Sequence, residues 1–254
     1  MPTVPDARSD PGPADRADPL ASLAALEGVA SAMAAARDGI DALLRDRGLR
    51  RTTPEVTTES LLLGASASAE LEGSASTLTE VRDGHGDATA RAALRVSTEL
   101  LGLVPVMARS PLQVFARLHT LAAAGDTDDA DLGRPRDPAA AQRLRELARL
   151  LSAPTSAPAL VAAAVVHAEI STAAPFSTHN GVVARAAERV LLVSRGVDPT
   201  SVTVPEAGHL RLRREYESNL RAYATGGSSG VHAWLLYAAE AYTAGAQASP
   251  ARDV

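Results

Sequence analysis

Cysteine and lysine are both absent from this chain of 254 residues. Without cysteine the protein can form no disulfide and perform no thiolate chemistry, which is typical of a reducing compartment, so we expect a cytoplasmic protein. All 25 basic residues are therefore arginine, and the 30 acidic residues give a net charge of −5. This balance predicts no general binding to nucleic acid.

Aromatic residues are also scarce, at 3% of the sequence, although hydrophobic residues reach 46%. The core must therefore consist mainly of alanine, leucine and valine, a composition that favours close-packed helices over strands. The N-terminus shows no apolar signal segment, and no run of about 18 apolar residues predicts a membrane span. We expect an all-α protein without a membrane partner.

The Pro- and Asp-rich residues 1–19 lack any periodicity and predict a disordered tail. Residues 20–248 predict a single helical domain, because apolar positions recur at three- and four-residue steps between Pro- and Gly-rich breaks. The expected helices cover residues 20–49, 57–72, 87–104, 111–124, 138–151, 157–172, 180–195, 205–224 and 229–246. Residues 202–204 are the one place where a short strand is conceivable.

The segment APFSTHNGVVAR, residues 174–185, follows a turn and opens a helix near Asn180 or Gly181. A helix start exposes unpaired N–H groups and a partial positive charge, so this segment predicts an anion-binding turn. Arg185 lies four residues after Gly181 and therefore on the same face of the helix. It could contact a second phosphate.

This segment resembles the motif of the Fic (Fido) family, H-P-F-x-x-G-N-G-R-x-x-R, which usually has an acid before the first Gly. The positions that agree are Pro175, Phe176, Asn180, Gly181 and Arg185. The positions that differ are Ala174 for the motif His, Thr178 for the acid, His179 for the first Gly and Val182 for the first Arg.

A second segment strengthens the resemblance. Ser68, Glu72 and Gly73 match the S/T-x-x-x-E-G helix that inhibits many Fic proteins. The resemblance implies an inhibitory helix at about 57–73, a Fic core at about 87–200 and further helices at 205–246. It also implies that Glu72 contacts the final motif arginine, so we predict a direct ion pair between Glu72 and Arg185.

Fic proteins transfer a nucleotide monophosphate, usually AMP from ATP, to a protein hydroxyl. The resemblance implies phosphate binding by Asn180, Gly181 and Arg185. The motif His would be the general base and the motif acid would hold Mg²⁺, but Ala174 cannot accept a proton and Thr178 is not anionic. We therefore expect a degenerate member, a binding or regulatory module with weak nucleotide affinity, doubtful Mg²⁺ binding and an unknown protein partner.

The target-docking β-hairpin of the family is also expected to be reduced or missing. Residues 133–151 of this chain contain almost no strand-forming residues and lead quickly into a helix. A docking edge for a target peptide would then be absent, which weakens a protein-modifying role independently of Ala174.

Other interpretations remain open at this stage. His179 could act as an alternative base in an active nucleotidyltransferase, or merely border the following helix. His167, in an apolar helix, could be a structural histidine, a ligand or a base. The remaining histidines show no metal-ligand spacing, so no metal site is predicted. A third alternative is a helical interaction protein with no nucleotide site.

Overall fold

The computed structural model describes residues 18–47 and 53–252, and these residues form an all-α fold. The helices of the N-terminal half are α1 (Pro19–Ala24), α2 (Val29–Arg47), α3 (Pro54–Leu71), α4 (Leu78–Arg82), α5 (Ala88–Glu99), η2 (Leu100–Leu103), α6 (Val104–Met107) and α7 (Pro111–Ala123). The helices of the C-terminal half are α8 (Pro138–Ser152), α9 (Ala159–Ala173), α10 (Asn180–Ser194), α11 (Pro205–Arg211), α12 (Arg213–Thr225), α13 (Gly227–Gln247) and η3 (Pro250–Arg252). Within the described residues no strand forms, apart from an isolated bridge between Ala124 and Thr127.

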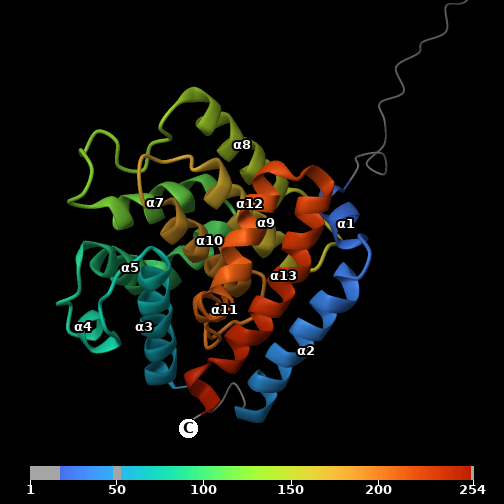
Figure 1. Cartoon of the computed structure of the whole chain (residues 1–254), viewed down its shortest axis with the longest axis horizontal. Coiled ribbons are helices and arrows are strands. Elements are labelled where there is room, and N and C mark those ends of the chain that lie inside the picture. Colours follow the sequence, from blue (N-terminus) through green and yellow to red (C-terminus); the bar gives the residue numbers. More distant parts are fainter. Residues whose placement is uncertain (1–17, 48–52, 253–254) are drawn as a thin grey trace, which may run out of the picture.

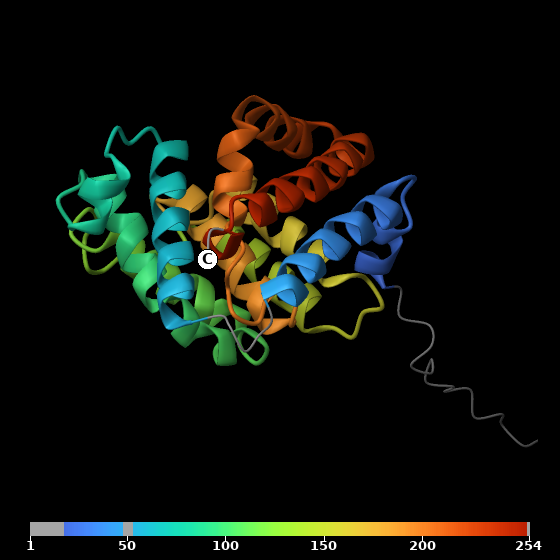
Figure 2. The same ribbon diagram turned by 90° about the horizontal axis from the view of Figure 1, so that it is seen from below.

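Helices α9 and α10 form an antiparallel pair at the centre of the molecule (Figure 1). Residues 160–168 of α9 are buried without interruption, so this helix is apolar on every face rather than amphipathic. Its many alanines let neighbouring helices approach closely. Helices α3, α7, α12 and α13 surround the pair, while α2 packs along α13 at the edge (Figures 1 and 2).

Several helix starts follow from capping residues that the sequence displays. Asp18, Asp87 and Asp137 each accept a hydrogen bond from the backbone N–H three residues later. Thr77 and Glu80 form a reciprocal capping box at the start of α4. The sequence therefore contained a signal for α4, a helix that periodicity alone did not predict.

Several predicted helices differ from the observed ones, and the helix predicted at 87–104 ends at Glu99, where η2 and then α6 follow. The first helix is interrupted before Val29, where Gly28 adopts a φ of 75°. The helix predicted at 205–224 divides at Leu212, whose φ of −107° and ψ of 36° are not helical. Helix α13 begins at Gly227, two residues before the start predicted at residue 229. Helix α3, predicted to begin at residue 57, begins at Pro54, because proline suits the first position of a helix.

Two further predictions need correction. Residues 202–204 are buried but form no strand, and the N–H groups of Val202 and Thr203 bind the Asp198 carboxylate instead of another strand. Asp18 and Pro19 belong to the folded domain, since Asp18 caps α1 and accepts hydrogen bonds from Thr155 and Ser156. The rest of the predicted tail and the predicted helix end at Leu49 lie outside the described residues.

Candidate functional site at the start of helix α10

The turn between α9 and α10 carries the motif, and two of its residues have left-handed backbone conformations. Ala174 has a φ of 42° and His179 a φ of 56°. Glycine adopts such angles more readily than other residues do, so His179 is a strained occupant of a position suited to glycine. Its ring has not prevented the turn from forming.

The Asn180 side chain fixes the shape of this turn. Its Nδ2 donates to the Phe176 carbonyl at 2.9 Å, and its Oδ1 accepts from the Phe176 N–H at the same distance. The carboxamide thus mimics a backbone pairing and closes the loop. Asn180, predicted as a phosphate ligand, here shapes the turn that presents the helix start.

The first turn of α10 faces a carboxylate of the same chain. A Cβ atom on Gly181 would collide with Oε1 of Glu72, so the carboxylate lies directly against the Gly181 backbone. Glu72 follows the last residue of α3, and Gly73 ends that helix with a φ of 90°. The start of α10 thus has a carboxylate where its partial positive charge favours an anion.

Arg185, one turn further along α10, forms an ion pair with the same Glu72 carboxylate. Its Nη2 donates to Glu72 Oε1 at 2.7 Å and to the Ser68 carbonyl at 3.1 Å, and its Nε donates to Ser68 Oγ at 2.9 Å. Its Nη1 donates to the hydroxyl of Tyr216 at 3.1 Å. The predicted ion pair between Glu72 and Arg185 is confirmed. Ser68, which was predicted to belong to the same site, accepts hydrogen bonds from Arg185.

The two partners of this ion pair differ in exposure. The Arg185 side chain is 1% exposed, whereas the Glu72 side chain is 33% exposed. Burial opposes the charge on Arg185, but the Tyr216 hydroxyl and the Glu72 carboxylate raise its pKa above the ordinary value, so the guanidinium stays charged. The arginine is fixed in the interior, and its carboxylate partner reaches it from the surface.

The loop after α7 covers the other side of the turn. The Thr178 hydroxyl lies 3.2 Å from the hydroxyl of Thr127, and His179 Nε2 lies 3.1 Å from a carboxylate oxygen of Asp126. Thr178 occupies the motif position of the acid, so the motif itself supplies no carboxylate for Mg²⁺. Asp126 was not predicted, because its loop is 53 residues away in the sequence.

At the motif histidine position, the side chain of Ala174 offers no group that could accept a proton. Phe176, two residues later, stacks on His119 with ring centroids 4.4 Å apart. His119 accepts a hydrogen bond from the Gly133 N–H through Nδ1, while its buried Nε2 has no hydrogen-bond partner among the described residues. Burial lowers the pKa of His119 to about 4. His119 thus packs against the turn from the buried side, through its contact with Phe176.

His167, whose role was left open, lies in a buried polar cluster of α9, α10 and α11. Its Nδ1 and the Nε2 of His209 lie 2.9 and 3.0 Å from one oxygen of Glu188. Sequence spacing did not reveal this group, because 21 residues separate Glu188 from each histidine.

This trio could in principle hold a metal ion. However, each nitrogen and oxygen of the trio already has a hydrogen-bond partner, including Tyr216, Tyr237 and Tyr242. A metal would have to replace this satisfied network. The geometry favours hydrogen bonding over metal ligation.

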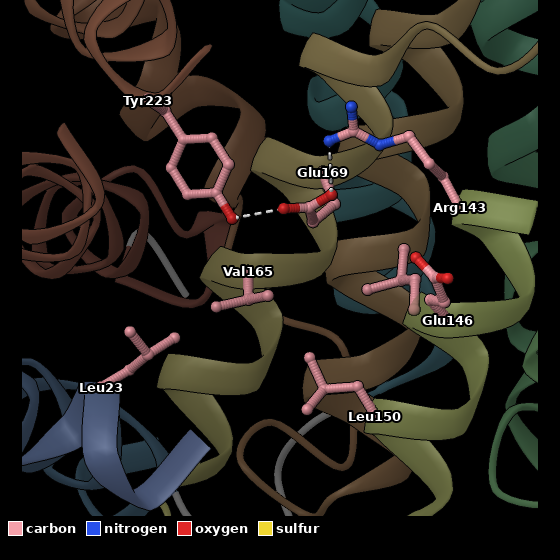
Figure 3. Close-up of a pocket in the computed structure, with 8 residues that line it drawn as sticks. Leu23, Arg143, Glu146, Leu150, Val165, Glu169 and Tyr223 are labelled. Atoms are coloured by element: carbon pink, nitrogen blue, oxygen red, sulfur yellow. Dashed lines mark hydrogen bonds and ion pairs between the residues drawn. The ribbon is translucent and has the colours of Figure 1, made fainter. Parts of the chain in front are cut away.

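A separate cavity of about 660 Å³ lies between α1, α8, α9 and α12 (Figure 3). Leu23, Leu150 and Val165 line its apolar part, and Glu169 lies at its polar edge. The Glu169 carboxylate accepts from the Tyr223 hydroxyl at 2.8 Å and from an Arg143 nitrogen at 3.3 Å. The polar groups at this edge thus satisfy one another, which leaves the motif turn as the better candidate site.

Of the predicted site residues, those of the motif and of α3 lie at the turn.

None of the helices formed by the described residues is both long and apolar enough to cross a lipid bilayer. The arginines of α12 have acidic neighbours, and Arg213 donates to Glu217 one turn later at 3.1 Å, as expected for a solvated helix face.

No family model and no curated protein matches the sequence. The structure, however, is similar to a Fic family protein from Desulfovibrio desulfuricans, with a TM-score of 0.69, 19% identity and coverage of 85% of this chain and 73% of that chain. It is also similar to residues 134–508 of Fic-1 from C. elegans, with a TM-score of 0.65, 16% identity and coverage of 94% and 77%. The all-α fold and the fold implied by the motif are both confirmed: the chain has the fold of Fic family proteins.

Proposed function

We propose that this Fic-fold protein is a binding or regulatory module whose α10 start binds the phosphate groups of a nucleotide. Glu72 controls that binding, and the protein does not transfer AMP by the usual route. The observation that carries the proposal is the position of the Glu72 carboxylate against Gly181 and Arg185. A helix N-terminus and a guanidinium together bind oxyanions, and here a carboxylate of the chain itself takes that place.

The carboxylate and a phosphate would compete for the same donors. Glu72 holds an Nη2 hydrogen of Arg185 and lies over the first turn of α10, so a phosphate can contact both only after Glu72 moves. Movement is feasible because the Glu72 side chain is 33% exposed and can return to water. Arg185 would remain in place through Ser68 and Tyr216.

Transfer of AMP needs a base for the attacking hydroxyl, and a positioned base contributes about 10²- to 10⁴-fold to such a step. Ala174 supplies none. The missing acid at Thr178 removes the motif ligand for Mg²⁺ as well. More residues of this site are suited to binding phosphate than to catalysing AMP transfer.

Calorimetry with ATP, with and without Mg²⁺, tests the proposal on the full chain. Glu72→Ala is expected to bind ATP at least about tenfold more tightly than the wild type, since removal of a competing carboxylate is worth about 1.4 kcal/mol. Glu70→Ala is the matched control, because it removes an exposed carboxylate from the same helix. Equal affinities for the Glu72→Ala and Glu70→Ala variants would refute Glu72 control, and no ATP binding to Glu72→Ala would refute the phosphate site.

A second candidate function is nucleotidyl transfer with His179 as the base. The contact that favours it is the hydrogen bond between His179 Nε2 and Asp126, which would hold the proton on Nε2 and leave Nδ1 free to accept one. Within the described residues Nδ1 has no hydrogen-bond partner. Incorporation of label from α-labelled ATP by Glu72→Ala, lost in Glu72→Ala/His179→Gln, would favour this function; no incorporation would favour the binding module.

A further inference from the structure

Behind Arg185 lies a chain of buried hydrogen bonds that leads away from the site. It runs from Arg185 to the Tyr216 hydroxyl at 3.1 Å, from that hydroxyl to His167 Nε2 at 3.0 Å, and from His167 Nδ1 to Glu188 at 2.9 Å. The side chains of His167 and Glu188 are fully buried, and Tyr216 is 5% exposed. The chain joins α10, α12 and α9 through side chains alone.

The direction of each bond follows from Glu188. Its carboxylate accepts from His167, His209 and Tyr242, and three donors stabilise the ionised form. Burial alone would raise the pKa of Glu188, but the two histidines hold it below its ordinary value. Glu188 is therefore an acceptor, and both histidines must donate to it.

The state of His167 then fixes that of Tyr216. Burial lowers the pKa of His167 to about 4, so the ring is neutral at pH 7 and carries one proton. That proton lies on Nδ1, toward Glu188, which leaves Nε2 to accept the Tyr216 hydroxyl proton. Tyr216 consequently turns a lone pair toward Arg185, which is the orientation that a guanidinium donor requires.

Tyr216 is also distinct among the partners of Arg185. Every other hydrogen bond of this guanidinium to the described residues ends on Ser68 or Glu72, at the end of α3. Once Glu72 moves, Ser68 would hold one edge of the guanidinium and Tyr216 the other. The orientation of Arg185 would then depend on α12.

We propose that Tyr216, oriented by His167 and Glu188, is the positioning residue that keeps Arg185 directed at a bound phosphate after Glu72 has left. This inference rests on the proposed function, because it concerns the same anion site. It assigns to Tyr216, His167 and Glu188 a role in phosphate affinity, although none of the three touches the phosphate.

The cluster offers a matched control for the test. Tyr237 is, like Tyr216, a 5% exposed tyrosine, and its hydroxyl lies 2.8 Å from the ring nitrogen Nδ1 of His209, a histidine that donates to Glu188 through Nε2. Tyr237 makes no hydrogen bond to Arg185 within the described residues and is linked to it only indirectly, through His209, Glu188, His167 and Tyr216. Replacing either tyrosine by phenylalanine removes one buried hydroxyl, so the cost to folding should be similar.

The experiment compares Glu72→Ala, Glu72→Ala/Tyr216→Phe and Glu72→Ala/Tyr237→Phe, with inorganic pyrophosphate as the probe in calorimetry. Loss of the Tyr216 hydroxyl is expected to weaken pyrophosphate binding about fivefold to tenfold, the effect of one hydrogen bond, while the Tyr237 variant stays within about twofold. Equal affinities in the two variants would overturn the inference.

A second measurement separates this inference from the proposed function. NMR of the Arg185 Nε–H group in the ligand-free Glu72→Ala protein should show faster hydrogen exchange after Tyr216→Phe and unchanged exchange after Tyr237→Phe. If Glu72→Ala does not bind pyrophosphate but this difference appears, the phosphate site fails while the positioning contact stands. If exchange is the same in both tyrosine variants, Tyr216 does not position Arg185.

Discussion

Arg185 and Arg189 lie one turn apart on α10, both point into the interior toward α3, and each pairs with a glutamate. Arg189 donates to Ser60, Ser201 and Glu206, and its Glu206 partner is 5% exposed. Arg185 pairs with Glu72, which is 33% exposed. The same residue type on the same helix therefore forms one closed ion pair and one that opens to the surface.

The two arginines differ in whether their glutamate partner can move into solvent. Glu206 cannot leave Arg189 without stranding two buried charges, which makes this pair a permanent part of the fold. Glu72 can return to water, and Arg185 then keeps its hydrogen bonds to Ser68 and Tyr216. Partner exposure, rather than the arginine itself, separates a structural pair from an exchangeable one.

The sharpest test of this comparison removes the same charge from each pair. Glu206→Gln should lower the free energy of unfolding by about 3–5 kcal/mol, because the buried Arg189 loses its counter-charge. Glu72→Gln should cost no more than about 1 kcal/mol, because this pair is partly exposed and Arg185 keeps other partners. Urea unfolding of both variants at pH 7 measures the difference; equal costs would contradict it.

Low pH should lower the stability of the protein around Arg185, because His167 belongs to the hydrogen-bond chain behind this arginine. Burial lowers the pKa of both His119 and His167 from 6.5 to about 4. Between these values the unfolded chain binds more protons than the folded one, so stability falls as pH falls from about 6.5 to 4. Each histidine should cost about 2 kcal/mol between pH 7 and pH 5, about 4 kcal/mol together.

The contribution of His167 can be isolated by urea unfolding at both pH values. His167→Gln should reduce the pH-dependent loss by about 2 kcal/mol. Glu206→Gln should leave that loss unchanged, because no described histidine hydrogen-bonds to Arg189. A pH dependence that His167→Gln does not alter would argue against a neutral, buried His167.

The glycines that face the two pairs provide the smallest test. A Cβ on Gly64 would collide with Arg189 and lie 2.9 Å from Glu206, whereas a Cβ on Gly181 would collide with Glu72. Gly64→Ala should cost about 1–3 kcal/mol, since neither buried partner can move aside. Gly181→Ala should cost less than about 1 kcal/mol, because Glu72 can swing outward and alanine favours a helix. Thermal unfolding of the two variants measures both costs, and a larger loss of stability for Gly181→Ala than for Gly64→Ala would contradict the comparison.

Much of the site was predictable because its signals are local. The turn and helix at residues 174–185 and the acid at Glu72 can be read from short motifs, and the structure confirms the ion pair that they imply. The break before Val29 and the division at Leu212 were missed, because helical periodicity continues across both positions. Short interruptions do not disturb an apolar repeat.

The polar contacts around the motif were not predictable in the same way. Asp126 reaches His179 across 53 residues, and Tyr216 reaches His167 across 49. No periodicity links such positions, and an aspartate in a loop or a tyrosine in an Arg-rich helix has many possible surroundings. Their roles depend on which helices pack together.

The sequence by itself determined the helical class, the turn that leads into α10 and the absence of a proton-accepting side chain at Ala174, because composition, capping and side-chain chemistry act within a few residues. Only the tertiary structure decided that the partner of Arg185 is partly exposed, that the partner of Arg189 is buried, and that Glu188 is linked to Arg185 through His167 and Tyr216. Burial and hydrogen-bond direction are properties of the packed helices, so they exist only after distant segments have come together.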